Sequence, residues 1–384
     1  MINVYFIFGA HSRARTLAEY MRITQPQMKL AAFMCDNDEA NPEEIEGVPV
    51  IRLSETVRMR DIEGRCGLVS FEEEAASTVA GNAIFLAIRG IYHEAVMERL
   101  KRLGFTNIIP VTVSFDTHIR TAYLKKRFED EKKDFVKIDD LEVNLRVAYC
   151  GDILHTACIF EVRSVYDKSP EKDSYERAPY ERSIQVGMML TEQRLENCDY
   201  RDDEGDNISA LNRCLCEETA LYWIWKHAKE DVIGLVHYRR HFYLPEDWEQ
   251  RMRTNGIDVI LPIPLYVGPN IAENYRFRHV AGDWDILMQL IRETSEEEYQ
   301  AAQKCFSGNL YCPCNMFVMK REVMQEYCAW LFPILFGVME RIGEREDAYQ
   351  NRYPAFMAER LLTLYFEMNR ERYRIVYADK GFLL

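Results

Sequence analysis

Residues 233–242 read IGLVHYRRHF, an apolar run followed at once by cationic and aromatic side chains. The apolar part has the β character of a buried strand. Two histidines and two arginines then fall within positions 237–241. Because open α/β sheets bind ligands in the crevice at the carboxyl ends of their strands, a strand that ends here would carry positive charge into that crevice. The stretch therefore predicts an α/β sheet with an anion site at its edge.

The size and charge of the chain limit the classes of protein to which it can belong. With 384 residues it is too long for one ordinary core, and we expect two domains. Its 48% hydrophobic and 29% charged residues are those of a globular protein. The net charge of −14 argues against a general nucleic-acid binder, which needs a basic surface. A local basic pocket is compatible with this charge.

Hydropathy and cysteine spacing give two further expectations. No run approaches the roughly 20 apolar residues of a membrane span. The apolar start of the chain lacks a basic segment and a cleavage site, so we read it as a first strand. The eleven cysteines include Cys-x-Cys pairs at 214–216 and 312–314. Zinc ribbons use matched Cys-x2-Cys pairs, so reduced buried thiols are the favoured interpretation.

The first third of the chain alternates apolar runs with helical segments. An amphipathic helix is expected at 91–103. Strands are expected at 2–8, 29–35, 48–51, 66–71 and 82–87. This alternation is typical of βαβ units and predicts a parallel sheet.

A charge-rich segment separates this part from the rest of the sequence. Acidic and basic residues alternate over 121–140, with aromatic and leucine side chains at roughly helical spacing. The pattern favours a solvated connecting helix. We therefore predict a Rossmann-like domain at 1–115, a charged helical linker at 116–150 and a second domain at 151–384.

The N-terminal part has three notable features: Gly9 after the first strand, an acidic strand end at Asp36 and Asp38, and the segment 45–50. In these residues it resembles the small Rossmann-like domain fused to bacterial sugar-modifying enzymes. The dinucleotide fingerprint requires further glycines after Gly9, and the sequence has Ala-His-Ser-Arg-Ala there instead. Asp36 is either a ribose ligand or a turn acid after a strand, and we favour the turn acid. An NAD-linked enzyme is therefore the weaker alternative.

The second half of the chain has strand and helix patterns of the same class. A dense turn at 202–209 ends in Ser209, which is placed to cap the helix that follows. Further strands are expected at 158–162, 257–262 and 315–319. Helices are expected at 210–228, 286–293, 321–341 and 354–369.

Several sequence blocks of this half occur together and in a fixed order. They are GDNIS at 205–209, CEETALYWIWK at 216–226, GLVHYRR at 234–240, and NMFVMK at 315–320 with AERL at 358–361. Through them residues 183–366 resemble the DUF4422 family of bacterial polysaccharide-gene glycosyltransferases. The resemblance implies a GT-A-like fold and a nucleotide-sugar donor. One departure is the strand end at 163–164, which reads Arg-Ser where the family commonly has His-Lys.

Glycosyl transfer from a nucleotide-sugar requires a counter-charge for the diphosphate as it leaves. A guanidinium group can donate two parallel hydrogen bonds to the oxygens of one phosphate, and it stays charged. We therefore predict that Arg239 and Arg240 bind the diphosphate, replacing or assisting a metal ion, with Tyr238 beside them. The alternative is that both arginines pair with acids. His237 is predicted to be catalytic, as a base, a donor-sugar ligand or a metal ligand, and a packed core histidine is the alternative. His241 has the weaker claim.

The turn before the first helix of this half supplies further candidates. Asp206, Asn207 and Ser209 precede a helix N-terminus, which can bind an anion or a ribose. We predict a catalytic role for Asp206 and donor binding for Asn207 and Ser209. Local turn and capping contacts are the alternative.

Other polar residues on expected helices and strands complete the set. Glu359 lies on an otherwise apolar helix, where a carboxylate can act as a general base or pair with an arginine. Asn315 begins a strand and is predicted to contact the donor sugar. Asp283 and Asp285 spell an Asp-x-Asp close to His279, and these residues are the metal candidates. Stabilisation of a helix start is the alternative for the two acids.

The sequence predicts an α/β protein with an N-terminal Rossmann-like parallel sheet and a C-terminal GT-A-like nucleotide-sugar-binding domain. We predict a glycosyltransferase of bacterial surface polysaccharide biosynthesis, with a UDP-sugar as the first candidate donor and a glycan or lipid-linked acceptor. Dependence on a divalent metal stays open. No nucleic acid and no membrane span are expected, and the expected location is the cytoplasm or the inner membrane face. The alternative is a non-catalytic sugar-nucleotide-binding or scaffold protein.

Overall fold

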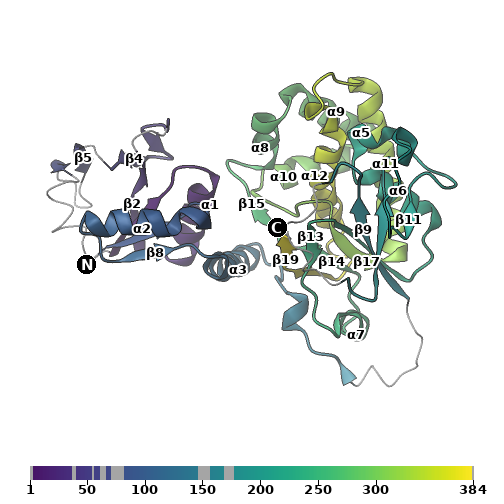
Figure 1. Cartoon of the computed structure of the whole chain (residues 1–384), viewed down its shortest axis with the longest axis horizontal. Coiled ribbons are helices and arrows are strands. Elements are labelled where there is room, and N and C mark those ends of the chain that lie inside the picture. Colours follow the sequence, from purple (N-terminus) through teal and green to yellow (C-terminus); the bar gives the residue numbers. More distant parts are fainter. Residues whose placement is uncertain are drawn as a thin grey trace. The chain divides into compact units, whose positions relative to one another are not determined.

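The computed structural model describes residues 3–36, 40–53, 56–60, 66–70, 82–145, 156–167 and 177–382. The chain forms two compact units, Met1–Phe135 and Val136–Leu384, each with its own sheet and core (Figure 1). The predicted linker at 116–150 falls on both sides of this division, and its last five residues, like Asp38, lie outside the described part.

The first unit is built on a mainly parallel sheet with strand order β3-β4-β2-β1-β7-β8. β1 (Asn3–Phe8) lies in the middle, parallel to β2 (Met28–Cys35) and to β7 (Ala83–Leu86). Apolar side chains of these strands pack against α2 (His93–Arg102) in one core. The other elements are α1 (Ser12–Thr24), β3 (Glu44–Ile45), β4 (Val48–Arg52), β5 (Thr56–Arg60), β6 (Cys66–Ser70), η2 (Gly90–Tyr92), β8 (Ile108–Pro110) and α3 (Val113–Asp130).

Gly9 and Asp36 make structural contacts at the ends of their strands. Gly9 has a φ of 121°, and a Cβ there would lie 3.1 Å from the Ala87 carbonyl oxygen. This close approach explains the glycine. Asp36 forms an ion pair with Arg99 of α2. That contact supports the interpretation of Asp36 as a strand-end acid.

The charge-rich segment forms α3, which packs on α1. The rings of Tyr123 and Tyr20 lie 4.7 Å apart between centroids, and both side chains are buried. The aromatic and leucine side chains at helical spacing thus form a buried side of α3, which is packed in the first unit rather than solvated all round.

The second unit contains a mixed sheet with strand order β11-β10-β9-β12-β17-β14-β18. β9 (Ala157–Arg163) is parallel to both β10 (Glu181–Gln185) and β12 (Val232–His237). β17 (Phe317–Lys320) runs antiparallel between β12 and β14 (Val259–Pro262). The apolar run of the opening stretch is therefore a central buried strand.

Short elements and helices complete this unit. After β12 the chain reverses into β13 (Arg240–Phe242), which also pairs with β19 (Lys380–Phe382). The remaining elements are η3 (Ile138–Asp140), η4 (Met188–Leu190), β11 (Tyr200–Arg201), η5 (Ser209–Leu211), α5 (Asn212–Leu215), α6 (Glu218–His227), α7 (Trp248–Thr254), β15 (Leu265–Tyr266), α8 (Ile271–Arg278), α9 (Ala281–Thr294), α10 (Glu296–Phe306), β16 (Leu310–Tyr311), α11 (Arg321–Ile342), η6 (Gln350–Arg352), α12 (Tyr353–Met368) and β18 (Ile375–Ala378).

Helices cover both faces of the mixed sheet, as expected for central strands that read as continuous apolar runs. On one face, Ile159 and Val236 share a core with Trp248 of α7. On the other face, Phe317 packs edge-on against Tyr327 of α11, with 6.3 Å between ring centroids. α12 is buried along most of its length and contacts α10 and α11 (Figure 1).

The α/β fold class with parallel sheets is confirmed, but one expected helix is broken. The sequence predicted a single helix over 210–228, whereas the structure has η5, α5 and α6. The break lies at Cys216, which has a φ of 49°. Arg352 donates a hydrogen bond to its sulfur, and the Asn212 side chain donates one to its carbonyl oxygen. These contacts with a remote arginine and a neighbouring side chain stabilise the break.

Two further expectations about helix starts were wrong. Ser209 does not cap a helix, because it is the first residue of η5 and its hydroxyl donates to Asp202. Asp283 and Asp285 do not precede a helix, because α9 begins at Ala281 and includes them both. In the described part of the chain, every helix is too short or too polar to cross a membrane.

Candidate functional site

The parallel strands β10, β9 and β12 end together at one edge of the second sheet. The chain passes from β9 to β10 on one side, whereas the later strand β12 pairs with β9 on the other side. Such a reversal of strand order is a topological switch point, where open α/β sheets form a ligand crevice. β12 ends at His237, whose register partner on β9 is Val162. The cationic cluster of the opening stretch therefore begins at this edge.

His237 is held by the turn that enters β17. Its Nε2 atom lies 2.5 Å from the carbonyl oxygen of Cys314. Because a carbonyl oxygen only accepts, Nε2 must carry the proton, and in the neutral ring Nδ1 is then an acceptor. One contact thereby sets both the orientation and the tautomer of His237.

Glu359 of α12 supports the same turn. Its Oε1 atom accepts a hydrogen bond from the Cys314 backbone nitrogen at 3.0 Å, and its Oε2 atom lies 2.8 Å from Nη1 of Arg360. Both carboxylate oxygens thus have partners within the protein. The arginine pairing is the alternative that the sequence left open for Glu359. A chain of contacts therefore runs from Arg360 through Glu359 and Cys314 to His237.

The turn itself has a backbone conformation that is rare outside glycine. Cys314 and Asn315 have φ values of 73° and 47°. Such residues cost about 1–3 kcal/mol each and are concentrated at functional sites. Asn315 is buried, and its amide donates to Oε1 of Glu217 at 2.8 Å and to the carbonyl oxygen of Ala355 at 3.3 Å. These contacts tie the turn to α12 and to the segment that leads into α6.

Asp167, just after β9, is a polar residue of this edge that the sequence analysis missed. Its Oδ2 atom accepts a hydrogen bond from the Ser164 backbone nitrogen at 2.6 Å. Burial raises the pKa of Asp167 to about 6, against the opposing effects of the Ser164 hydrogen bond and the charges of Arg163, His237 and Arg239. The carboxyl therefore titrates near neutral pH. The sequence signal was only an acid three positions after a serine at a strand end.

Arg239, Arg240 and Tyr238 lie in and beside the reversal that follows β12. Arg240 is the register partner of His237, and the Arg239 guanidinium lies 4.9 Å from the centroid of the Tyr238 ring. Burial raises the pKa of the Cys314 thiol to about 11, while the charge of Arg240 acts to lower it. The charge of Arg239 likewise acts to lower the pKa of Asp167. The two arginines therefore contribute positive potential to the groups around His237.

Two consecutive glutamates at the start of α6 lie close to the Cys314–Asn315 turn. Glu217 accepts the Asn315 amide, as described above. Glu218 is fully buried, and neither of its carboxyl oxygens has a hydrogen-bond partner within the described ranges. Burial, followed by the charges of Glu217 and Glu359, raises the pKa of Glu218 well above its ordinary value. Burial thus favours the neutral form of this carboxyl over its ionised form.

Ser209 lies near the same edge of the sheet, in a network organised by Asp202. The Ser209 hydroxyl donates to Oδ1 of Asp202 at 2.5 Å. The carboxylate also accepts from the backbone of Gly187 and Met188, which follow β10, and from Thr219 of α6. β10 and β12 are separated by β9, so these groups lie roughly 10 Å from the end of β12 by ordinary strand spacing. The Ser209 hydroxyl is thus engaged in holding the loop after β10.

Asp206 and Asn207 are not brought to His237. Asn207 accepts from the Ser209 backbone nitrogen and donates to the carbonyl oxygens of Asp203 and Gly205, which are the contacts of a local turn. Asp206 is exposed and accepts from the Tyr222 hydroxyl at 3.2 Å. Tyr222 belongs to the middle of α6 rather than to its start.

The three metal candidates each have a partner within the protein. Asp283 is buried and forms an ion pair with Arg345, and Asp285 lies 2.6 Å from Arg276. The His279 ring stacks on Phe356 with 4.1 Å between centroids. Within the described ranges, no group of three or more His, Cys, Asp or Glu side chains is arranged to hold a metal ion.

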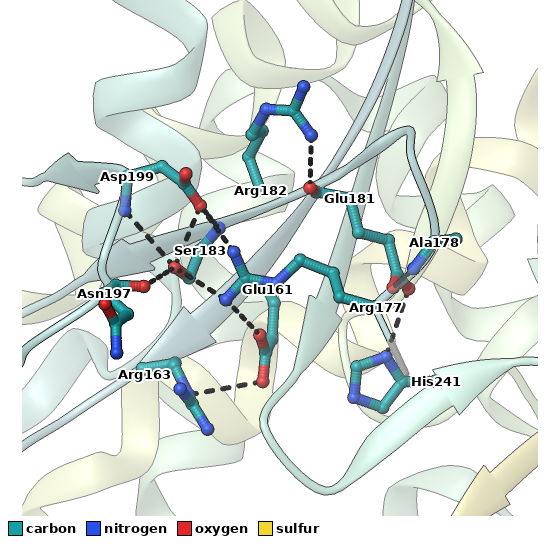
Figure 2. Close-up of polar contacts among 10 residues, drawn as sticks. All are labelled: Glu161, Arg163, Arg177, Ala178, Glu181, Arg182, Ser183, Asn197, Asp199 and His241. Carbon is teal, nitrogen blue, oxygen red and sulfur yellow. Dashed lines mark hydrogen bonds and ion pairs between the residues drawn. The ribbon is translucent and has the colours of Figure 1, made fainter. Parts of the chain in front are cut away.

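On the opposite face of the sheet, charged side chains join β9, β10 and the loop before β10 (Figure 2). Arg177 lies between Glu161 and Asp199, with N···O distances of 3.6 and 2.8 Å. Arg163 lies 3.3 Å from Glu161. Burial raises the pKa of Glu161, and the charges of Arg163, His241 and Arg177 oppose this effect.

His241 belongs to this second network. Its Nδ1 atom lies 3.2 Å from Oε1 of the buried Glu181 (Figure 2). Successive strand residues point to opposite faces, and Glu161 is paired with Val236 rather than with His237. The two histidines of the opening stretch therefore lie in different networks, His237 with Cys314 and His241 with Glu181 on the opposite face.

Comparison with solved structures supports a glycosyltransferase-like fold. The bifunctional glycosyltransferase WbbM, solved in its apo form, matches with a TM-score of 0.52 and 24% identity. The match covers 59% of this chain and 45% of WbbM, so the chain spans less than half of that protein. RSP, a Rex-family repressor, matches with a TM-score of 0.21 and 15% identity over 34% of this chain and 62% of its own, too low to support a structural inference. No curated protein matches the chain.

The fold and the carboxyl-edge site define the second unit as a mixed α/β domain of glycosyltransferase-like architecture. The model of the family described as a domain of unknown function, DUF4422, matches residues 168–370, which is just over half of the chain. The chain belongs to the DUF4422 family.

Proposed function

We propose that the second unit is a glycosyltransferase that uses a nucleotide-sugar and that its reacting groups meet at the end of β12. The observation that supports this most directly is the placement of His237. The ring lies at the topological switch point, where its orientation is set by the strained Cys314 turn and, through that turn, by Glu359. A histidine fixed in this way has the preorganisation that a catalytic or substrate-positioning group requires.

Arg239 and Arg240 would bind the diphosphate of the donor. Their charges already influence Asp167 and Cys314, and the Cys314 carbonyl oxygen contacts His237. As the bond between the anomeric carbon and the diphosphate breaks, negative charge develops on the leaving phosphate. Fixed guanidinium groups stabilise such charge. His237, whose Nδ1 atom is an acceptor, would then contact a hydroxyl group of the donor sugar.

Asp167 is the residue that we propose as the general base. Its pKa of about 6 makes it largely ionised at neutral pH while it stays basic enough to accept a proton. The acceptor hydroxyl would give its proton to Asp167, its oxygen would bond to the anomeric carbon, and the diphosphate would leave. Glu359, whose oxygens are both engaged, becomes a positioning residue for the Cys314 turn.

The finer predictions remain part of this proposal. They comprise a GT-A-type site, a UDP-sugar donor, a glycan or lipid-linked acceptor, and a place in bacterial surface polysaccharide assembly. The arginine pairs of Asp283 and Asp285 favour a structural role for these acids over metal binding. Asp206 and Asn207, which contact α6 and their own turn, are the weaker donor candidates.

The test is donor binding by a variant that carries both Arg239→Ala and Arg240→Ala. Calorimetry with UDP- and GDP-hexoses should show binding by the unaltered protein and a Kd that rises at least about tenfold in the variant. Arg253→Ala, an exposed arginine on α7, is the matched control and should leave the Kd unchanged. An unchanged Kd in the double variant would refute the assigned diphosphate site. Sugar transfer or donor hydrolysis then distinguishes an enzyme from a non-catalytic binder.

A further inference from the structure

The helices α8, α9 and α10 of the second unit enclose a groove that is separate from the surroundings of His237. Its volume is about 470 Å³. Small-molecule sites typically occupy about 300–1,000 Å³, so the groove has the size of a ligand site. Its walls include Asn270, Glu273, Arg276, Gln289, Tyr299 and Gln303.

The charges that line this groove balance one another. Arg276 lies 2.6 Å from Asp285 and 3.6 Å from Glu273. Arg292 lies 3.1 Å from Glu296. The Arg276 guanidinium lowers the pKa of Asp285, which keeps this carboxylate ionised. Because each arginine already has a carboxylate partner, a phosphate or carboxylate ligand would have to displace an ion pair. The groove therefore suits an uncharged ligand.

The remaining lining groups suit a polyhydroxyl ligand. The Asn270 oxygen accepts from the Glu273 backbone nitrogen, and the Gln289 nitrogen donates to Glu293, so Asn270 keeps its amide donors and Gln289 keeps its acceptor oxygen for a ligand. The Gln303 amide donates to the Tyr299 hydroxyl at 3.1 Å, so these two groups form a preset polar pair. Trp284 and Phe306 lie beneath the groove and are almost fully buried, so the partly exposed ring of Tyr299 is the aromatic surface that this lining offers to a ligand. A sugar ring presents hydroxyl groups at its rim and C–H groups on its faces. The amides match the hydroxyl groups, and the Tyr299 ring matches the C–H groups.

A short series of contacts links the floor of the groove to the proposed active site. The Trp284 and Tyr275 rings lie 5.0 Å apart between centroids. The Arg360 guanidinium lies 5.7 Å from the centroid of Tyr275, and Arg360 pairs with Glu359. One layer of side chains therefore separates the groove from the residues that support His237.

We propose that this groove binds a neutral oligosaccharide, as a distal subsite for the glycan that receives the sugar. The role as acceptor rests on the proposed function, whereas binding of the oligosaccharide does not. The ligand class is argued from the balanced ion pairs, which disfavour acidic glycans, and from the amide groups and the Tyr299 ring of the lining.

The test measures oligosaccharide binding to the full chain without nucleotide. Saturation-transfer NMR and calorimetry would be run with neutral tetrasaccharides of glucose, galactose and N-acetylglucosamine, and with uronic acid tetrasaccharides for comparison. The variants are Gln303→Ala and Tyr299→Ala on the groove wall. The control is Gln300→Ala, an exposed glutamine of the same helix that does not line the groove.

We expect at least one neutral tetrasaccharide to bind, with its Kd rising at least about tenfold in either wall variant and staying within about twofold in the control. Binding of none of the neutral tetrasaccharides, binding that the wall variants do not weaken, or a preference for uronic acids would each overturn the proposal. Oligosaccharide binding that persists where nucleotide-sugars do not bind would refute the proposed function and leave the groove assignment standing. Nucleotide-sugar binding without oligosaccharide binding would refute the groove assignment and leave the proposed function standing.

Discussion

Replacement of Asp167 by asparagine tests whether the carboxyl after β9 is the base of the proposed transfer. Burial raises the pKa of Asp167 to about 6. From that value, about a tenth of the carboxyl is ionised at pH 5 and about nine tenths at pH 7, so kcat/KM should rise about tenfold between them. The Asp167→Asn variant keeps an oxygen that can accept from Ser164 but cannot remove a proton. It should lose roughly 10²–10⁴-fold in rate, together with that pH dependence.

The same substitution affects stability without any substrate. The native pKa of Asp167 is raised above its ordinary value of 3.8, so the folded state binds the proton more tightly than the unfolded state. The contribution of Asp167 to the free energy of unfolding is therefore at its maximum below about pH 4 and is lost as the pH rises through 6. The rise of this pKa from 3.8 to about 6 corresponds to about 3 kcal/mol, which solvent screening reduces to about 1–2 kcal/mol for a partly exposed group. The Asp167→Asn variant should lack this decrease.

Two measurements check these expectations. The first is the pH profile of kcat/KM for transfer from the UDP- or GDP-hexose that binds, and the second is urea unfolding at pH values from 4 to 7. Asp247→Asn, on the loop before α7, is the control and should retain both pH dependences. The reasoning fails if the Asp167→Asn variant keeps the rise in kcat/KM or retains activity within about threefold. A stability profile identical to that of the unaltered protein would refute the raised pKa.

Three further predictions concern stability. Glu218→Gln should leave the Tm unchanged or raise it, because burial raises the pKa of the Glu218 carboxyl well above its ordinary value and the carboxyl has no hydrogen-bond partner in the described residues. The pKa of His279 is lowered to about 4 by burial and by the charge of Arg360, so stability should fall as the pH drops from about 6.5 to 4, and His279→Phe should not show that fall. Gly234→Ala should cost about 1–3 kcal/mol through overpacking, because a Cβ there would lie 2.8 Å from Cγ1 of Ile159.

Thermal and urea unfolding check all three predictions, and a different result would contradict each of them. A Tm that drops by more than about 5 °C in Glu218→Gln would show that Glu218 is ionised and bonded in the native state. A pH dependence that persists in His279→Phe would remove His279 as its source. Gly282→Ala is the control for Gly234→Ala, because a Cβ at Gly282 meets no atom within 4 Å, and the two should differ clearly.

Much of the fold was predictable from the sequence because its signals are local. Continuous apolar runs identified β1, β2, β9, β12 and β14 as buried strands, and their alternation with helical segments indicated parallel pairing. The abrupt change from apolar to cationic and aromatic side chains at His237 located the end of the central strand. Helix boundaries were less predictable where remote groups decide them. The break at Cys216 depends on Arg352, which is 136 residues away in the chain.

The sequence by itself determined that a histidine and two arginines follow a buried strand at a ligand-binding edge, because strand character and strand end depend on neighbouring residues alone. The tertiary structure decided how these groups are used. The carbonyl that orients His237 lies 77 residues away, and the carboxylate that supports this turn comes from α12. Asp167 acquires its raised pKa only through burial, and His241 is turned to the opposite face by its partner Glu181. Such effects arise from contacts between segments that are distant in the chain, and no local pattern records them.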